Sequence, residues 1–367
     1  MQVFFFSFLL FVLPLIVLPF GVSYFETPKI ILAEILIEIL FIFFIFGKID
    51  LKKNINKVPY YLLVGIFLLT LLDLVLFRTS ISLFGNVFRL QGIFVLWHLL
   101  IFSFISSQFD FKTVPKYIPS IAFGLLVFGG FSFGTNQAGR AVGTIGEPNA
   151  LSATVLFIWP FVYFLSLNKP TINKMLKILL LVLVSSLIFL TGSRSGLIGF
   201  SIQLIFISLL KYFKLSFKKA SIIAFLLILT SLSLPFFERG GIYENRKDVW
   251  VTAFFTGLRN PVLGTGFGNI EKDLPETARQ ISNNSRFQYV DSSHNVLLDW
   301  WVQGGLVGLS IFCLLIFFSF TNFLKNSKIP ETTLFLGVFS AMLFNPASIV
   351  TLVAFWFLVG QGLRVER

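Results

Sequence analysis

The sequence predicts an all-α polytopic membrane protein, with about twelve transmembrane helices in one bundle. Hydrophobic residues make up 56% of its 367 residues and charged residues only 13%, which excludes an ordinary soluble domain. Its apolar residues, including 49 phenylalanines, form runs long enough to cross a hydrocarbon core of about 30 Å. Because no repeat or low-complexity linker interrupts these runs, we expect residues 1–367 to form a single domain.

Apolar runs separated by short polar segments define the predicted helices. The ninth and tenth runs are separated by a long polar segment, residues 237–293, which we expect to be a large extracytoplasmic loop. Its aromatic content favours a folded structure within the loop. The runs lie at about residues 3–20, 29–46, 58–77, 90–108, 117–133, 149–167, 174–191, 196–211, 219–236, 294–320, 332–344 and 347–363.

The distribution of basic residues predicts the orientation of the bundle. With both termini in the cytoplasm, the short cytoplasmic segments hold most of the basic residues, as the positive-inside rule requires. These are lysines except for Arg364 and Arg367. The net charge of +12 is therefore a property of membrane topology and does not indicate a nucleic-acid partner.

On the predicted external side arginine predominates. A planar guanidinium binds phosphate or carboxylate through two parallel hydrogen bonds, so these arginines suggest an anionic ligand. Ion pairing with acidic residues of the long loop is the alternative, and we expect it to account for several of them. The external arginines are Arg78, Arg89, Arg140, Arg194, Arg239, Arg246, Arg259, Arg279 and Arg286.

In the first three predicted helices, three acidic residues lie inside the apolar runs: Glu34, Glu38 and Asp73. Intramembrane carboxylates commonly have a function, of which proton relay is the obvious one. An interior hydrogen bond or a neighbouring basic group would also keep them there. His98, in the middle of the fourth predicted helix, is expected to be a neutral, hydrogen-bonded packing residue.

One of the two histidines, His294, stands where the long polar segment gives way to the apolar run 294–320. An unperturbed imidazole has a pKa near 6.5 and can exchange protons in such a position. Further along the run, Gly305 and Gly308 are expected to give the helix a bare face, and Gly304 with Gly308 forms a pair that allows close helix approach. The alternative is a helix-capping histidine followed by packing glycines.

Four arginines are placed where they could contact an anion. Arg194 lies in a short turn between two apolar helices, where an unpaired charge is costly; pairing with a carboxylate is the alternative. Arg246 begins an amphipathic stretch that could lie in the membrane interface. Arg140 follows a glycine in a tight external loop, and Arg89, at the start of the fourth helix, could reach a lipid phosphate or simply extend to the membrane surface.

Several motifs together resemble the O-antigen ligases, the O-antigen polymerases and the related bacterial O-linked oligosaccharyltransferases. They occur in order and on one predicted side of the membrane. They are His294-Asn295 followed after nine residues by Gly305-x-x-Gly308, Gly143-Thr-x-Gly-x-Pro-Asn149, Ser193-Arg194 with a small residue after it, Arg246-x-x-x-Trp250 with Asn260-Pro-x-x-Gly-x-Gly266, and Arg89 before Gln91-Gly92.

The resemblance implies a glycosyltransferase of the cytoplasmic (inner) membrane that works on the extracytoplasmic face. Its donor would be a glycan on undecaprenyl diphosphate, embedded among membrane lipids, and its acceptor a lipid or glycan hydroxyl. Arg194 and Arg246 would bind the leaving diphosphate and His294 would orient or deprotonate the acceptor. Arg140, Arg89 and Asn295 are further candidates for substrate contact. A single displacement would invert the anomeric centre, with no cofactor and no metal.

The acceptor stays open at this point. Lipid A-core for a ligase, a growing glycan for a polymerase and a protein hydroxyl for an oligosaccharyltransferase are all compatible with the motifs, and we favour the first two. A lipid-linked oligosaccharide flippase or transporter is the alternative from another class. Convergence of Arg194, Arg246 and His294 would favour transfer, whereas their dispersal would favour transport or a structural role.

Overall fold

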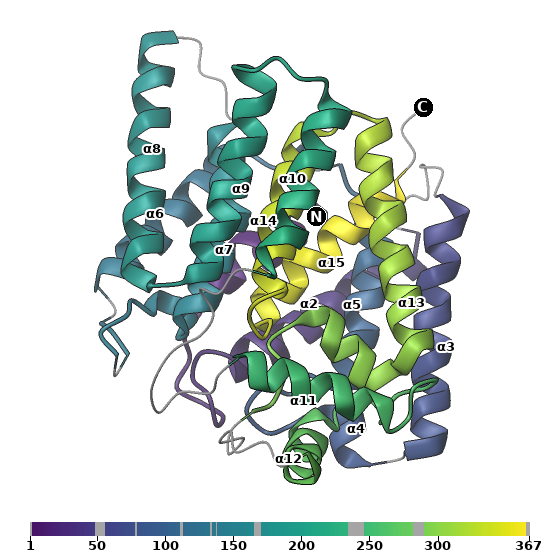
Figure 1. Cartoon of the computed structure of the whole chain (residues 1–367). Helices are drawn as coiled ribbons and strands as arrows, with labels where there is room; N and C mark the ends of the chain where they lie inside the picture. The colour runs from purple at the N-terminus through teal and green to yellow at the C-terminus, as the bar shows by residue number, and fades with distance from the viewer. Residues whose placement is uncertain are drawn as a thin grey trace.

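The computed structural model describes residues 2–47, 56–77, 79–110, 113–132, 134–136, 138–164, 170–233, 246–281 and 290–364. Over these residues the fold is all-helical, as predicted, with one isolated β-bridge between Thr135 and Ala141 (Figure 1). Every one of the twelve predicted apolar runs contains a helix. Arg78, Arg239 and Arg286, among the predicted external arginines, lie outside the described residues.

Most helices begin and end within a few residues of the predicted bounds. The first run is the exception, since α1 (Gln2–Ser7) passes into a π-helical turn (Phe8–Val12) and a 3-10 turn (Leu13–Leu15) that contains Pro14. The others are α2 (Thr27–Ile45), α3 (Lys57–Phe77), α4 (Ser80–Phe84), α5 (Ile93–Ser106), α6 (Tyr117–Ser132), α7 (Pro148–Tyr163), α8 (Pro170–Thr191), α9 (Arg194–Lys211), α10 (Phe217–Ser231), α11 (Arg246–Leu258), α12 (Ile270–Gln280), α13 (Val296–Lys325), α14 (Ile329–Met342) and α15 (Ile349–Leu363).

The lengths and surfaces of the helices are those of a helical membrane protein. Among the described residues, four helical stretches are both long and apolar enough to cross a membrane: Lys57–Phe77, Thr171–Thr191, Arg194–Lys211 and Val296–Lys325. Shorter apolar helices accompany them. Large apolar side chains such as Val75 and Phe189 are 77% exposed, as expected of residues that face lipid. The number of twelve spans stays a prediction.

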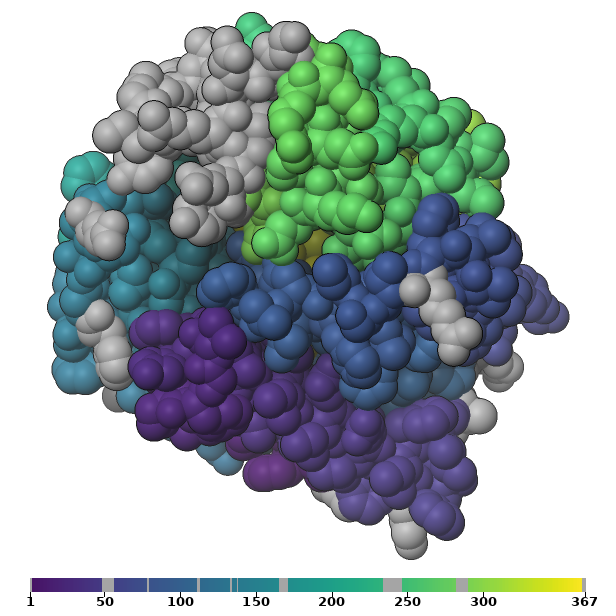
Figure 2. Space-filling view, turned by 90° about the horizontal axis from the view of Figure 1, so that it is seen from below, coloured from purple at the N-terminus to yellow at the C-terminus, as the bar shows by residue number. Residues whose placement is uncertain are grey.

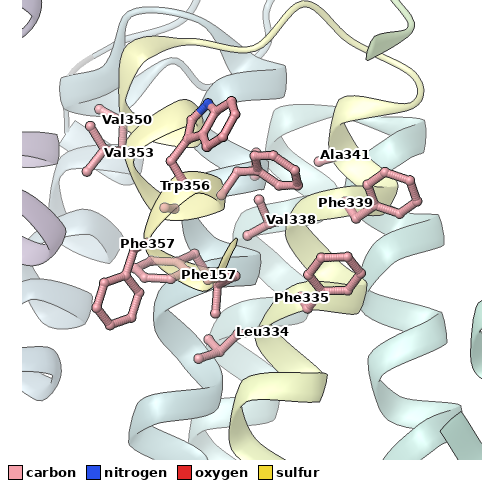
Figure 3. Close-up of a cluster of buried hydrophobic side chains, with 14 of the residues drawn as sticks. Phe157, Leu334, Phe335, Val338, Phe339, Ala341, Val350, Val353, Trp356 and Phe357 are labelled. Carbon is pink, nitrogen blue, oxygen red and sulfur yellow. The ribbon is translucent and has the colours of Figure 1, made fainter. Parts of the chain in front are cut away.

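The centre of the bundle is formed by α7, α14 and α15. Almost every residue of these helices is buried, which is the pattern of a helix that is apolar on all sides. Figure 3 shows how their side chains meet: Phe335 and Phe339 project from α14, Val353 and Trp356 from α15, and Phe157 from α7. The connection between α14 and α15 is therefore held in the middle of the protein.

The described parts of the predicted loop fold across one end of the bundle. Residues 246–281 form α11 and α12, and residues 290–293 lead into α13, whereas 237–245 and 282–289 lie outside the described residues. Figure 1 shows α11, α12 and the short α4 at the lower end, while the connection from α9 to α10, which begins after Lys211, is at the upper end. The predicted lysine-rich and arginine-rich sides are thus opposite ends of the bundle.

Helix α13 is broken inside the membrane run, which the sequence analysis treated as continuous. Gly305 has φ +60° and ψ −156°, so the helix ends there and restarts. Residues 261–268 cross the break: the N–H of Thr265 donates to the carbonyl of Val302 (2.8 Å), and the N–H of Leu306 donates to the carbonyl of Pro261 (2.8 Å). Because lipid offers no partners to free backbone groups, this inserted segment supplies them.

Contacts near the break account for two features predicted from the sequence, the buried Asp73 and the glycine pair of α13. The N–H of Phe267 donates to both carboxylate oxygens of Asp73 in α3, at 3.2 Å each, which gives this buried acid a structural partner. Gly304 and Gly308 both face the side chain of Leu69 in α3, as expected of a pair that allows close approach. Gly305 is instead the point of the break.

The imidazole of His98 is hydrogen-bonded and packed, as predicted. Its Nδ1 lies 2.8 Å from the carbonyl of Phe94, and its Nε2 lies 3.1 Å from a carboxylate oxygen of Glu38. His98 is 7% exposed, so it is a hydrogen-bonded packing residue that also gives Glu38 a partner.

We expect Gly305→Ala to destabilise the protein by roughly 2 kcal/mol or more, because a side chain is strained at this φ. In addition, its Cβ would lie 2.5 Å from the backbone of Val262 and Gly264. The control is Gly124→Ala in α6, where a Cβ meets nothing within 4 Å and φ is not positive. Thermal unfolding in detergent measures both. Equal midpoints for the two variants would contradict the proposed role of the break.

Candidate functional site

The connection between α14 and α15 is the meeting point of the candidate site. Asn345, 5% exposed, accepts a hydrogen bond at Oδ1 from Nη2 of Arg246 (2.8 Å) and donates through Nδ2 to the hydroxyl of Ser195. Trp250, one turn after Arg246, packs its ring against Phe344, with the ring centres 6.3 Å apart. Two residues four apart on α11 therefore contact the same connection, which accounts for the Arg-x-x-x-Trp spacing.

Ser195 belongs to the turn that carries Arg194. The Ser193 side chain caps α9 by accepting from the N–H of Gly196 (3.1 Å), and its hydroxyl lies 3.0 Å from that of Ser195. A further hydroxyl, from Ser152 of α7, donates to Ser193 (2.9 Å). This buried hydrogen-bonded chain fixes the turn, and Asn345 connects it to Arg246.

Arg194 begins α9 and is half-buried. Within the described parts of the chain its guanidinium makes no hydrogen bond or ion pair. A half-exposed guanidinium in this state can bind an anion through two parallel hydrogen bonds.

Arg140 supports the same turn from the other side. Its Nε donates to the carbonyl of Thr191 (2.6 Å) and its Nη2 donates to Oδ1 of Asn149 (2.9 Å). Its side chain also lies against Gly192, where a Cβ would come within 3.3 Å of Nε. The structure thus places Arg140 next to the turn that bears Arg194.

Arg89 lies in a separate cluster of charges. Its Nε donates to Asp291 and its Nη1 donates to the carbonyl of Ala347 (3.4 Å). Burial disfavours the charged form of the guanidinium, but the negative charges of Asp291 and Glu26 outweigh this effect and raise the pKa of Arg89. Arg89 is therefore a charged residue with a carboxylate partner, the alternative to a ligand contact raised by the sequence.

Glu26 completes this cluster beneath the α14–α15 connection. Its carboxylate accepts from the N–H of Ile349 (2.6 Å) and from Nε2 of Gln91 (3.2 Å), and Gln91 also donates to the carbonyl of Ala347 (3.0 Å). Burial raises the pKa of Glu26, although Arg89 and the N–H of Ile349 oppose the shift.

His294 lies just before α13 in a strained backbone conformation with φ +58°. Asn295 caps the helix, since its Oδ1 accepts from the N–H of Leu297 (2.9 Å). The half-buried Asp299 accepts from the Ser292 hydroxyl (2.8 Å) and from the N–H of Ser293 (2.7 Å), and it interacts electrostatically with His294. The capping role falls to Asn295, so the side chain of His294 is not used for it.

Two cavities open around these residues. One, of about 160 Å³, is lined by Asn345, Asp291, Ser292 and Arg89 at its polar part and by apolar side chains of α5, α13 and α15. The other, of about 230 Å³, has Arg89, Asp291 and Pro346 in common with the first. Figure 2, which views this end from below, shows a hollow between the blue segment that precedes α5 and the green α11–α12 region.

The structure therefore joins some of the predicted site residues and separates others. Arg246, Arg140 and the turn of Arg194 form one connected group. The hydrogen bonds that link this group do not include His294, but Asp291 and Ser292, which precede His294, line the same cavity as Asn345. Asn345 was not among the predicted site residues, and its only local signal is a polar Asn-Pro pair between two strongly apolar runs.

Comparison with known families gives one match. Residues 179–313 match the family model described as O-antigen ligase, which confirms the resemblance over this part of the chain. The matched segment contains Arg194, Arg246, His294 and Asn295, whereas Arg89, Arg140 and Asn345 lie outside it. A comparison with curated proteins found no match.

We expect Asn345→Ala to lower the free energy of unfolding by about 1–3 kcal/mol, because it leaves the buried Ser195 hydroxyl and Arg246 without their shared partner. Asn326→Ala is the control: its amide donates to the side chain of Asn322 (3.0 Å), after the last turn of α13. Thermal unfolding should shift much further for Asn345→Ala. Comparable shifts would show that the connection does not depend on this amide.

Glu26 should make stability depend on pH. Its pKa is raised above the ordinary 4.5, so the folded protein holds the proton more tightly than the unfolded chain. This contribution is complete below about pH 4.5 and is lost as pH rises through the folded-state pKa. Glu26→Gln, which stays neutral, should flatten that fall when unfolding is followed from acidic to neutral pH. Parallel curves for the two proteins would contradict the assignment.

Proposed function

We propose that this membrane protein, whose residues 179–313 match the O-antigen ligase model, transfers a glycan from undecaprenyl diphosphate to an acceptor hydroxyl during assembly of cell-surface polysaccharide. The family match indicates O-antigen ligase-type glycosyl transfer in a membrane. The observation that carries the finer proposal is the path from Arg246 through Asn345 to Ser195, beside Arg194. This path brings two guanidinium-bearing segments, distant in sequence, to one place.

In the proposed mechanism the arginines stabilise the leaving group. The bond between the anomeric carbon and the diphosphate oxygen breaks, and the electron pair departs with the diphosphate. Arg194, with its guanidinium unengaged among the described residues, and Arg246 would neutralise the charge that develops there. Arg140 would hold the Arg194 turn in position through the carbonyl of Thr191.

His294 would act on the acceptor. As the acceptor oxygen bonds to the anomeric carbon, the imidazole takes the hydroxyl proton, a role worth about 10²–10⁴-fold in rate. Asp299, held by Ser292 and Ser293, would stabilise the imidazolium that results. The single displacement inverts the anomeric centre and uses no covalent enzyme intermediate. We place this chemistry on the extracytoplasmic face, at the end of the bundle that carries the arginines.

The first test reconstitutes the purified protein in lipid with a synthetic undecaprenyl-diphosphate-linked oligosaccharide. Separate reactions receive lipid A-core, a second donor molecule or a serine-containing peptide. Release of undecaprenyl diphosphate together with a longer glycan in one reaction would identify the enzyme as ligase, polymerase or protein oligosaccharyltransferase. If no reaction releases it, and wild type and His294→Ala cannot be distinguished, the transporter alternative gains support.

We expect His294→Asn to abolish transfer while the protein stays folded. Asparagine tolerates the positive φ of this position better than alanine does, so the change removes the imidazole with little added strain. Abundance and thermal unfolding should match wild type. Full activity in His294→Asn would refute the role of the imidazole.

Arg194→Ala should likewise abolish transfer, and Arg194→Lys should restore only part of it, because an ammonium does not reproduce the planar two-pronged contact. The control is Arg279→Ala in α12, where an exposed guanidinium donates to the carbonyl of Pro275 (3.2 Å). It removes one basic residue from the same predicted side. Equal rates for Arg194→Ala and Arg279→Ala would leave no specific role for Arg194.

A further inference from the structure

The cavity of about 230 Å³ contains chemistry that the transfer mechanism does not use. Its walls come from the segment before α2, the segment before α5, the start of α7 and the α14–α15 connection. Resting on the proposed function, we propose that this cavity binds one neutral sugar ring of a transferase substrate. Cavities for drug-sized ligands typically have volumes of about 300–1,000 Å³. The smaller volume of this cavity suits a single sugar ring.

The charges around the cavity oppose an anionic ligand. Three carboxylates line it, from Glu26, Glu147 and Asp291, and the guanidinium of Arg89 is already paired with Asp291. A diphosphate would be repelled here, whereas the group of Arg194, Arg246 and Arg140 attracts it. The two regions therefore select different parts of a substrate: the arginines take the charged part, and the carboxylates take a neutral polyhydroxylated part.

The polar groups of the wall can accept hydrogen bonds from sugar hydroxyls. A carboxyl group can accept hydrogen bonds at both oxygens, and it keeps acceptor capacity when it is protonated. Oε1 of Glu26 accepts from Gln91 and Ile349, and the two oxygens of Glu147 accept from Asn149 and Ala150, so acceptor positions are left on both groups. The hydroxyl groups of Ser23 and Ser348 add groups that donate as well as accept.

Two aromatic rings supply the apolar counterpart. Phe25 and Phe88 both line the cavity, and Phe88 is 56% exposed. The face of a sugar ring that carries its C–H groups can pack against such a phenyl ring while its hydroxyls meet the carboxylates. Phe88 is the residue best placed to contribute to binding without contributing to the buried core.

The position of the cavity connects it to the proposed reaction. Arg89, Asp291 and Pro346 separate it from the cavity that Asn345 lines, and Pro346 follows Asn345 directly. A sugar bound there would be held next to the arginine group by the α14–α15 connection. The ring could belong to the acceptor or to the donor glycan, and kinetics with each substrate separates these sources.

Binding is tested without any donor. The full chain in lipid nanodiscs is titrated with the methyl glycosides of glucose, galactose and N-acetylglucosamine, and saturation-transfer NMR reports contact against empty nanodiscs. We expect contact with at least one glycoside, weakened about five- to tenfold by Phe88→Ala and retained in Phe88→Trp. Val87→Ala is the matched control, because Val87 is adjacent and 62% exposed but does not line the cavity.

Inorganic pyrophosphate is the second probe. Its binding should be unchanged by Phe88→Ala and reduced by Arg194→Ala. The inference would be overturned if no glycoside made contact, or if contact were equal in wild type and Phe88→Ala. It would also be overturned if pyrophosphate displaced the glycoside from Arg194→Ala protein, because the two ligands would then share one site.

Turnover then identifies the source of the ring. A five- to tenfold higher KM for the acceptor in Phe88→Ala, with KM for the donor unchanged, assigns the cavity to the acceptor, and the reverse assigns it to the donor. Glycoside binding without any transfer would contradict the proposed function and leave the sugar site standing. Transfer with both KM values unchanged in Phe88→Ala would contradict the site and leave the proposed function standing.

Discussion

The architecture depends on the need to give every backbone group inside a membrane a partner. The break of α13 at Gly305 frees such groups, and the segment from Pro261 to Gly268 enters to meet them. That segment is joined on one side to α11 and on the other to α12, so the same hydrogen bonds that repair the helix also fix both helices against the bundle. Arg246, at the start of α11, is held over the α14–α15 connection as a consequence.

The charged residues at this end divide into two groups with opposite character. Arg246 donates to the amide of Asn345, and Arg140 donates to the carbonyl of Thr191, beside the serine-lined turn that carries Arg194. These hydrogen bonds bring the three arginine-bearing segments together. Around Arg89 the partners are carboxylates, which cancel its charge. Similar arginines in similar loops therefore offer different chemistry, because their neighbours differ.

The sequence predicted the helical class, and it placed a helix in each apolar run, because runs of that length and composition have few alternatives in lipid. It could not predict the break at Gly305, because the sequence alone does not distinguish a glycine that packs against another helix from a glycine that interrupts its own helix. Asn345 was missed for a related reason: its partners Arg246 and Ser195 are 99 and 150 residues away. The ion pair of Arg89 with Asp291 was foreseen only as a general alternative.

The central position of α14 and α15 has a consequence for biogenesis. The arginines and the histidine are all synthesised before the asparagine that connects two of them, and that asparagine arrives between two helices that are buried on every side. Until this hairpin inserts between its earlier neighbours, the turn of Arg194 and the start of α11 have no common support. The connection between the start of α11 and the Arg194 turn through Asn345 therefore forms only after this hairpin has inserted.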